Sequence, residues 1–386
     1  VWEVNSGGPG DFVQIAEAIA SPAVLNGHVL LVHKGVGYAN FVLDKDLHLI
    51  AAAGERFSVK YPVVQGVGDF TLSGMDAARL DVNGAAGRGR LHDLKTGLAD
   101  VGECGYYLVE GYVRIEDADQ LVISNSKLAG SSGHYPESGT TNPGLSLRRS
   151  NAIVVDSVLD GGTDDWCGYH PTGGAQSAAQ LFEGSHAIFA GTELWAGNAL
   201  AALGFEGPPA VWVEDSVVSV RGSTSTLVRG GEGFSGLGPA IHGSGASAAT
   251  ISGVTQLATL PSAAWVVELA VPEPYLLLEG DETVGSSRTA VVYGPSGETA
   301  FLLVSTAPDL AAAPLPGYDL LWIDTGALLA TVPLVTAGQD VGVPVDLGDP
   351  GLWATVGGGL ILQAWFPPGS STGPFVTNVA EALVRW

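Results

Sequence analysis

Basic residues are scarce in this chain, and lysine is the scarcest of the charged types. Its 386 residues include 16 lysines and arginines against 40 aspartates and glutamates, which gives a formal net charge of −24. Only five lysines occur, and none follows Lys127. Because nucleic-acid binding requires a basic surface that displaces counterions, the sequence predicts no nucleic-acid partner.

Long apolar runs are absent as well. No segment approaches the ~20 consecutive apolar residues of a membrane-spanning helix, and the apolar stretch Leu25–Val32 is short and interrupted by His28. The sequence therefore predicts no membrane span. It begins at Val1 with neither a methionine nor an apolar leader, which is typical of a mature secreted protein whose signal peptide has been removed. We expect an extracellular or cell-surface location.

Cysteine is limited to Cys104 and Cys167. One interpretation is a disulfide between neighbouring segments of the fold, which an oxidising compartment permits. The other is a pair of buried thiols that pack as small apolar side chains. Sequence spacing does not supply the distance that a disulfide requires, so both interpretations stay open. Two cysteines without suitably spaced histidines do not predict a metal site.

A short motif recurs along the chain. The stretch Val154–Gly161 is a β-branched run, a small polar residue at a bend, a second run and a glycine. Similar stretches are Leu121–Gly130, Ala187–Leu194 and Val211–Val218. The small polar residues that align are Ser126, Ser157, Thr192 and Ser216. Imperfect repeats of roughly 20 to 50 residues indicate stacked architectures, and repeats made only of strands favour a solenoid of parallel strands.

The N-terminal segment predicts a cap for such a solenoid. A first strand and a glycine turn precede Asp11, which we expect to cap a short helix. The apolar face of that helix should comprise Phe12, Ile15, Ala16 and Ile19.

This segment also resembles a known family. The series is Gly-Gly-x-Gly-Asp-Phe at 7–12, Ile-x-x-Ala-Ile at 15–19, a buried strand ending in Gly35, then Tyr38 and Leu-Asp-Lys-Asp-Leu-His-Leu-Ile at 43–50. It is similar to the N-terminal region of right-handed parallel β-helix proteins of the pectate-lyase-like superfamily, many of them secreted by bacteria. The resemblance extends over about residues 1–270. It implies an all-β, right-handed parallel β-helix whose first coil is protected by a short capping helix.

The pattern changes near residue 272. The stretch 269–274 is typical of a linker, and short strands separated by Gly/Pro turns follow it. We expect them at 276–278, 289–293, 300–305, 319–323, 327–331, 360–366 and 382–386. Their number and length favour an antiparallel β-sandwich. The sequence thus predicts a parallel β-helix domain at 1–271 and a C-terminal β-sandwich domain at 272–386.

The loops between coils lengthen from about residue 130. Long glycine-rich segments occupy 130–144, 161–174, 197–209 and 230–245. If coils stack in register, these loops emerge along one edge and form a shared surface. The aromatic rings on it are candidates for ligand binding, and the alternative is that they pack the loops together: Tyr135, Trp166, Tyr169, Phe205 and Phe234.

The candidate catalytic residues are Arg148, Asp164, Asp165 and His170. Paired carboxylates bind Ca²⁺ or act as acid and base on a glycosidic bond. The resemblance adds that polysaccharide lyases of this fold use a basic residue beside acidic calcium ligands. The alternative is structural, with the aspartates in turns and the arginine bound to a neighbouring carbonyl or carboxylate. Apart from this calcium hypothesis, no cofactor is predicted.

Two functional hypotheses follow. The first is an extracellular structural or surface β-helix protein that is not an enzyme, and that self-associates into fibres or binds glycans. The alternative is a polysaccharide lyase or glycoside hydrolase acting in a groove formed by the 130–245 loops. Because one fold supports many activities, the fold does not decide between them.

Overall fold

The computed structural model describes residues 1–35, 37–101, 107–131, 141–162, 175–199, 205–270, 273–279, 287–305, 328–336, 341–346, 359–367, 370, 375–377 and 380–383. The chain divides into two compact units, Val1–Val267 and Glu268–Trp386. The sequence placed this boundary a few residues later, between 271 and 272. Each unit has its own buried core.

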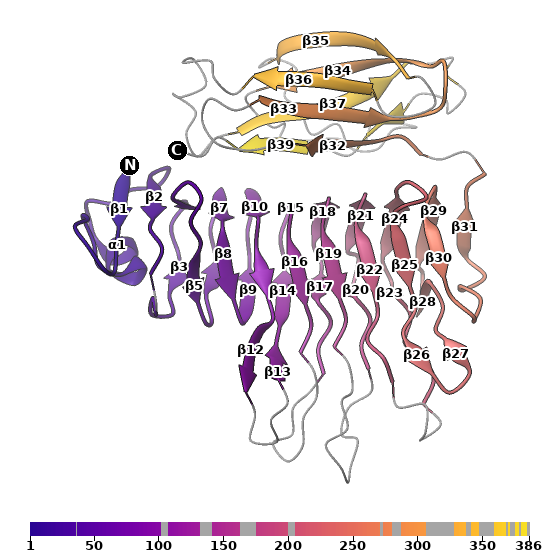
Figure 1. Cartoon of the computed structure of the whole chain (residues 1–386), viewed down its shortest axis with the longest axis horizontal. Coiled ribbons are helices and arrows are strands. Elements are labelled where there is room, and N and C mark those ends of the chain that lie inside the picture. Colours follow the sequence, from indigo (N-terminus) through magenta and orange to yellow (C-terminus); the bar gives the residue numbers. More distant parts are fainter. Residues whose placement is uncertain are drawn as a thin grey trace. The chain divides into compact units, whose positions relative to one another are not determined.

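The first unit is a solenoid with three parallel sheets along its sides (Figure 1). Sheet A comprises β1 (Trp2–Val4), β2 (Val29–Val32), β4 (His48–Ala51), β7 (Phe70–Ser73), β10 (Arg88–His92), β15 (Gln120–Ser124), β18 (Asn151–Val155), β21 (His186–Ala190), β24 (Val217–Arg221), β29 (Ala248–Ser252) and β31 (Val266–Glu268). Sheet B comprises β5 (Phe57–Val59), β8 (Met75–Ala77), β11 (Lys95–Thr96), β16 (Lys127–Ala129), β19 (Val158–Asp160), β22 (Glu193–Trp195), β25 (Leu227–Arg229) and β30 (Thr255–Leu257). Sheet C comprises β3 (Val42–Leu43), β6 (Val63–Gln65), β9 (Arg79–Asn83), β14 (Tyr112–Glu116), β17 (Leu145–Arg148), β20 (Ala179–Phe182), β23 (Val211–Glu214) and β28 (Ile241–Ser244).

From β4 onward the chain runs through sheets A, B and C in turn, and each strand pairs in parallel with its counterpart one coil away. This is the predicted right-handed parallel β-helix, the hand that parallel crossovers adopt almost without exception. The antiparallel hairpins β12 (Leu98–Val101) with β13 (Tyr107–Glu110), and β26 (Glu232–Gly233) with β27 (Gly236–Leu237), interrupt the passage from sheet B to sheet C. Figure 1 shows both hairpins projecting along the same edge.

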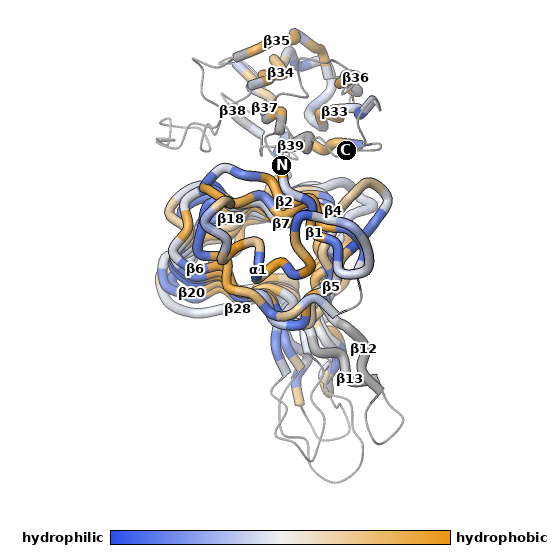
Figure 2. Tube along the Cα trace, turned by 90° about the vertical axis from the view of Figure 1, so that its left-hand side faces the viewer, coloured by the Kyte–Doolittle hydropathy of each residue, from blue (hydrophilic) through white to orange (hydrophobic). Residues whose placement is uncertain are grey.

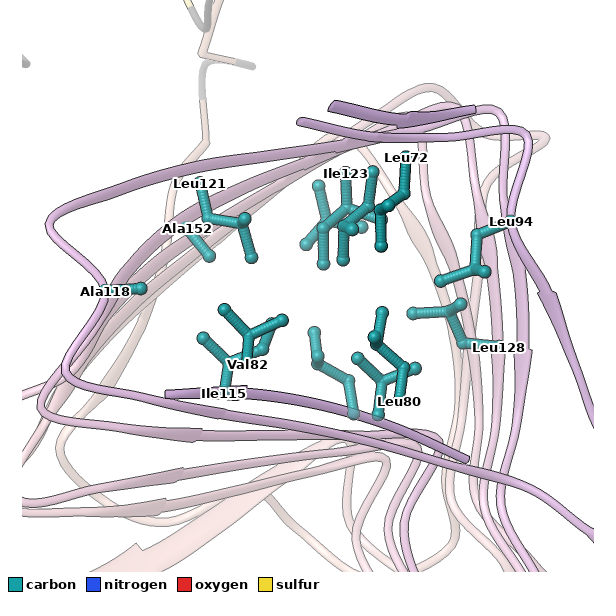
Figure 3. Packing of buried hydrophobic residues seen from close by; sticks show 14 of the residues in the cluster. Leu72, Leu80, Val82, Leu94, Ile115, Ala118, Leu121, Ile123, Leu128 and Ala152 are labelled. Carbon is teal, nitrogen blue, oxygen red and sulfur yellow. The ribbon is translucent and has the colours of Figure 1, made fainter. Parts of the chain in front are cut away.

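Aliphatic side chains from all three sheets fill the interior (Figure 3). Leu72, Leu91 and Ile123 occupy matching positions on β7, β10 and β15, so each packs on its counterpart in the next coil. Leu80 from sheet C lies beside Leu128 from sheet B, whereas Val82 and Ile115 from sheet C lie opposite Leu121 and Ala152 (Figure 3). These residues are fully buried, and the alternate strand positions face outward.

The helix α1 (Ile15–Ala20) closes the N-terminal end, and a view along the solenoid axis shows it across the first coils (Figure 2). Its buried residues are Ile15, Ala18 and Ile19. The prediction that Asp11 caps it is wrong: the capping position is Gln14, without a side-chain cap, whereas Asp11 accepts a 2.8 Å hydrogen bond from the Glu3 amide. In the described part of the chain no helix is long and apolar enough to cross a membrane.

Two of the three corners turn within a few residues. Between sheets A and B the turn residue has a left-handed backbone at Asp93, Asn125 and Asp156, with φ between 45° and 48°. Between sheets C and A the same conformation occurs at Asp117, Arg149, Glu183 and Asp215. Aspartate and asparagine tolerate this region better than other residues with a Cβ atom, which explains the recurring acidic residue in the motif.

Serines beside several of these sharp corners build hydrogen-bonded ladders inside the solenoid. At the A–B corner the Ser126 amide donates to the Ser157 hydroxyl at 3.1 Å, and the Leu94 amide donates to the Ser126 hydroxyl. A second ladder runs through Ser150, Ser185 and Ser216 at the C–A corner. The alignment of Ser216 with Ser157 in the sequence is therefore wrong. Both corners have the same motif, but Ser157 lies at the A–B corner and Ser216 at the C–A corner.

The second unit is the predicted antiparallel β-sandwich. One sheet has the order β32 (Tyr275–Glu279), β33 (Ser287–Tyr293) and β36 (Val341–Asp346). The other contains β35 (Leu328–Val335), β34 (Thr299–Ser305), β37 (Gly359–Phe366), β38 (Phe375–Val376) and β39 (Ala380–Leu383). Leu276, Val292, Leu302, Leu362 and Phe366 contribute to the core between the sheets. The strand β36 was not foreseen, and the predicted strand at 319–323 lies outside the described residues.

Core truncation in one coil should destabilise the solenoid strongly. Phe189 is fully buried between Val154 and Val220 of the neighbouring coils. We expect Phe189→Ala to lower the free energy of unfolding by about 3–5 kcal/mol. The change is measured from urea unfolding followed by far-ultraviolet circular dichroism.

The matched control is Val217→Ala on the adjacent strand, since Val217 is 45% exposed. This control should change stability by no more than about 0.5 kcal/mol. Equal losses in the two variants would contradict the stacked core.

Candidate functional site

The long loops share one corner of the solenoid, as expected. They leave sheet B after Ala129, Asp160, Trp195 and Arg229, and the chain returns each time to the next strand of sheet C. Their bases continue the parallel pairing: the Gly130 amide donates to the Asp160 carbonyl and the Gly161 amide to the Trp195 carbonyl, both at 2.7 Å. The outer faces of sheets B and C therefore meet at the loop-bearing edge.

Most of the candidate residues named from the sequence lie outside the described part of the chain. These are Cys104, Tyr135, Asp164, Asp165, Trp166, Cys167, Tyr169 and His170. The disulfide, the calcium hypothesis and the carboxylate pair therefore stay predictions. Among the residues that the structure describes, no group of three or more histidine, cysteine, aspartate or glutamate side chains is placed to hold a metal ion.

Phe205 and Phe234, from successive loops, come together. The Phe234 amide donates a 2.7 Å hydrogen bond to the Phe205 carbonyl, and the Ser235 hydroxyl donates to the Glu206 carboxylate at 2.8 Å. Both rings are exposed, Phe205 by 42% and Phe234 by 68%. The expectation that loops of different coils form one surface holds for this pair.

Arg148 belongs to an ion-pair network at the C–A corner. Its guanidinium binds the Glu183 carboxylate in a fork, with Nε to Oε2 at 2.8 Å. Arg149 bridges two coils, since it donates to Asp117 Oδ1 at 2.7 Å and to Glu183 Oε2 at 2.6 Å. Arg148 is thus bound to a neighbouring carboxylate, as expected if its role is structural.

The network shifts the ionisation of its members. The hydrogen bond from Arg148, and to a smaller extent the one from Arg149, lowers the pKa of Glu183 from 4.5 to about 2, while burial opposes the shift. The hydrogen bond from Arg149 likewise lowers the pKa of Asp117. A carboxylate held ionised in this way is a poor proton donor at neutral pH, so Glu183 is suited to holding the corner and not to acid catalysis.

The outer face of sheet C carries a second arrangement, which we call the sheet C row. On these strands the intervening positions, such as Leu80, Val113 and Leu181, are buried in the core, so the row faces outward. One side chain from each successive strand stands in register: Asp81, Arg114, Ser146, Gln180, Trp212 and His242. Adjacent members are therefore separated by about one strand spacing, 4.8 Å.

The row combines hydrogen-bonding groups with aromatic rings. The Trp212 and His242 ring centroids lie 5.8 Å apart with the planes inclined by 38°. Gln180 precedes Trp212 in the register and donates to the Gln176 side chain at 2.8 Å. Asp81 and Arg114 pair with Arg79 and Glu116 on their own strands. The face thus offers amide, carboxylate, guanidinium and ring surfaces within one line.

Sequence inspection missed the sheet C row. Gln180, Trp212 and His242 each occupy an outward position in an alternating strand, and this signal is visible in the sequence. Their alignment is not visible, because loops of different length separate the strands and only the pairing register brings the three side chains together.

Comparisons with known proteins found only distant similarity. No family model and no curated protein matches the chain. Tailspike protein 2 of the Escherichia coli O157:H7 bacteriophage CAB120 is similar in structure, with a TM-score of 0.34 and 10% identity over 89% of this chain and 58% of the tailspike. For the A-module of a mannuronan C-5 epimerase from Azotobacter vinelandii, the TM-score is 0.18 and the identity 12%, over 66% of this chain and 94% of the module. The strand pairing itself shows that the chain contains a parallel β-helix. The chain spans 58% of the tailspike's length.

The corner network should be visible in a titration. Glu183 has a lowered pKa, so its pairing stabilises the fold above the ordinary carboxyl pKa and is lost as the pH falls from about 4.5 towards about 2. Arg149→Gln removes one of its two cationic donors. We expect the Glu183 pKa, followed by carbon-13 NMR of the side-chain carboxyl, to rise towards 4.5 in this variant.

Lys34→Gln removes the same charge from the N-terminal coils and is the control. It should leave the Glu183 titration unchanged. A titration near 4.5 already present in the wild-type protein would show that the ion pairs do not form in solution.

Proposed function

We propose that this chain is an extracellular, non-enzymatic surface protein that binds glycans on the outer face of its β-helix. The sheet C row carries the proposal, because it presents successive polar groups and an aromatic pair along one rigid, partly exposed line. Function concentrates on surfaces that a rigid scaffold positions. Membership of the pectate-lyase-like superfamily is part of the same proposal and rests on the N-terminal sequence series.

The chemistry of the row fits a saccharide. The apolar face of a pyranose ring packs on an aromatic ring, as Trp212 offers beside His242. Hydroxyl groups both donate and accept hydrogen bonds, and so does the Gln180 amide. Because the groups repeat with the coils, a chain molecule lying along the solenoid axis would meet a new contact at each strand.

The charges on this face support binding in preference to acid–base chemistry. Asp81 pairs with Arg79 at 2.8 Å, Glu116 with Arg114 at 2.5 Å, and Glu183 with Arg148 and Arg149. Glycoside hydrolysis needs one carboxylic acid whose pKa is raised. Pairing with arginine acts in the opposite direction, as the lowered pKa of Glu183 shows.

Loss of the ring should weaken glycan binding. We expect Trp212→Ala to raise the Kd for a bound glycan about tenfold. The packing of a sugar ring on an indole should contribute on the order of 1 kcal/mol to binding. A glycan array identifies the ligand, and isothermal titration calorimetry measures the wild-type protein and the variant.

Tyr61→Ala removes an exposed ring from an early coil and is the matched control, with unchanged affinity expected. Equal affinity in Trp212→Ala and the wild-type protein would contradict the proposed face. Incubation with the bound glycan should produce no new reducing ends or unsaturated products. Their appearance would replace the proposal by the polysaccharide lyase or glycoside hydrolase alternative.

A further inference from the structure

Three neighbouring strands of the second unit, β35, β34 and β37, contain no charged residue. The other strands of that sheet, β38 and β39, pair with the far edge of β37 and contribute a single charge, Glu381. The formal net charge of the chain is −24, so most of its surface repels a second acidic molecule. A run of three adjoining strands without charge is therefore a distinct part of that surface.

The two faces of these strands differ in burial. Leu302 and Ala364 are fully buried in the core of the sandwich, so the residues that alternate with them point outward. Among the outward residues, Pro333, Phe301 and Trp365 stand in one register row across β35, β34 and β37. The Phe301 and Trp365 rings contact each other, with 5.5 Å between their centroids.

The outward side chains form a partly exposed apolar surface. Val335 is 59% exposed, and Phe301, Leu303 and Trp365 are half-buried although they lie outside the core. Contiguous apolar surface of this kind marks sites of association in soluble proteins. We call the following six residues the uncharged face: Phe301, Leu303, Thr331, Pro333, Val335 and Trp365.

Prolines obstruct association through the strand edges of the sandwich. In the described part of the chain β35 and β36 are edge strands, and each contains a proline at an inner position, Pro333 and Pro344. A proline has no amide hydrogen to donate to an added strand, so it interrupts edge-to-edge pairing. The faces of the sheets remain available for contact when the edges are protected in this way.

A second copy of the chain fits the uncharged face in charge and in shape. A basic partner would be attracted to the acidic surface elsewhere, whereas two uncharged faces meet without repulsion. Packed sheets lie about 30° from parallel because both have the same twist, and a copy of this sheet has that twist by identity. Strands of eight residues in a layer of three give a footprint of about 26 by 14 Å. This is smaller than a standard interface, so the expected contact is weak.

We infer that the uncharged face pairs two copies of this chain face to face about a two-fold axis. Such a contact uses the same surface on both copies and closes on itself, so it yields dimers and does not extend into a fibre. The inference goes beyond the proposed glycan binding and does not depend on it, because it concerns the second unit alone.

Sedimentation velocity of the full chain between about 1 and 200 µM should show a monomer–dimer equilibrium with a micromolar dissociation constant. Val335→Glu puts an unpaired carboxylate from each copy into the contact, and we expect the dissociation constant to rise at least about tenfold. Thr331→Glu is a second variant at a position that is already exposed, and the same direction is expected. Thermal unfolding followed by circular dichroism confirms that each variant is folded.

The matched control is Val13→Glu, the same substitution at a valine that is 54% exposed in the N-terminal segment. It should leave the dissociation constant unchanged. Added sodium chloride should tighten the dimer, because salt screens the repulsion between two acidic copies. If both face variants unfold, hydrogen exchange in the wild-type chain decides, and amides of 328–335 should exchange more slowly at the higher concentration.

Several results would overturn the inference. These are a wild-type chain that stays monomeric throughout the range, growth beyond the dimer, an equal effect of Val13→Glu and Val335→Glu, dissociation by salt, and exchange rates at 328–335 that do not depend on concentration. None of them bears on glycan binding at Trp212, so the two proposals fail independently.

Discussion

The solenoid depends on strict register between neighbouring coils. Leu72, Leu91, Ile123, Val154 and Phe189 follow one another on adjacent strands of sheet A, each buried against the next. A slip of one residue would turn every side chain of a strand to the opposite face. The register that packs these inner side chains also aligns the outer ones. The alignment of the sheet C row is therefore a consequence of the buried core.

The sharp corners maintain this register, and their residues show how. Asp93, Asn125 and Asp156 take the left-handed backbone that short polar side chains tolerate. Arg149 and Glu183 take it as well, although their residue types rarely do. Ion pairs join these two side chains to each other and to Arg148 and Asp117. Arg148, the only catalytic candidate among the described residues, thus belongs to a network that stabilises a strained corner.

The sequence predicted the architecture but not which outward side chains align across neighbouring strands, and the reason is physical. Short β-branched runs with glycine and small polar bends are local signals, so the β-helix, the capping helix and the sandwich could be predicted. Register is not local. The motif around Ser157 and the motif around Ser216 look alike but serve different corners, and loops of different length conceal that Gln180 and Trp212 are neighbours. Asp11 failed as a cap because the Glu3 amide competes for its carboxylate.

The loop-bearing edge connects the two faces, and glycine makes this possible. A Cβ atom on Gly161 would lie 2.1 Å from the Gln176 carbonyl oxygen, and one on Gly197 would lie 2.1 Å from that of Gly162. Backbones of successive loops therefore approach more closely than any other residue allows. Since Asp160 immediately precedes Gly161, the loop bases fix the end of β19 as firmly as the sheet does. This rigid edge also fixes the position of the outer face of sheet C relative to the strand ends of sheet B.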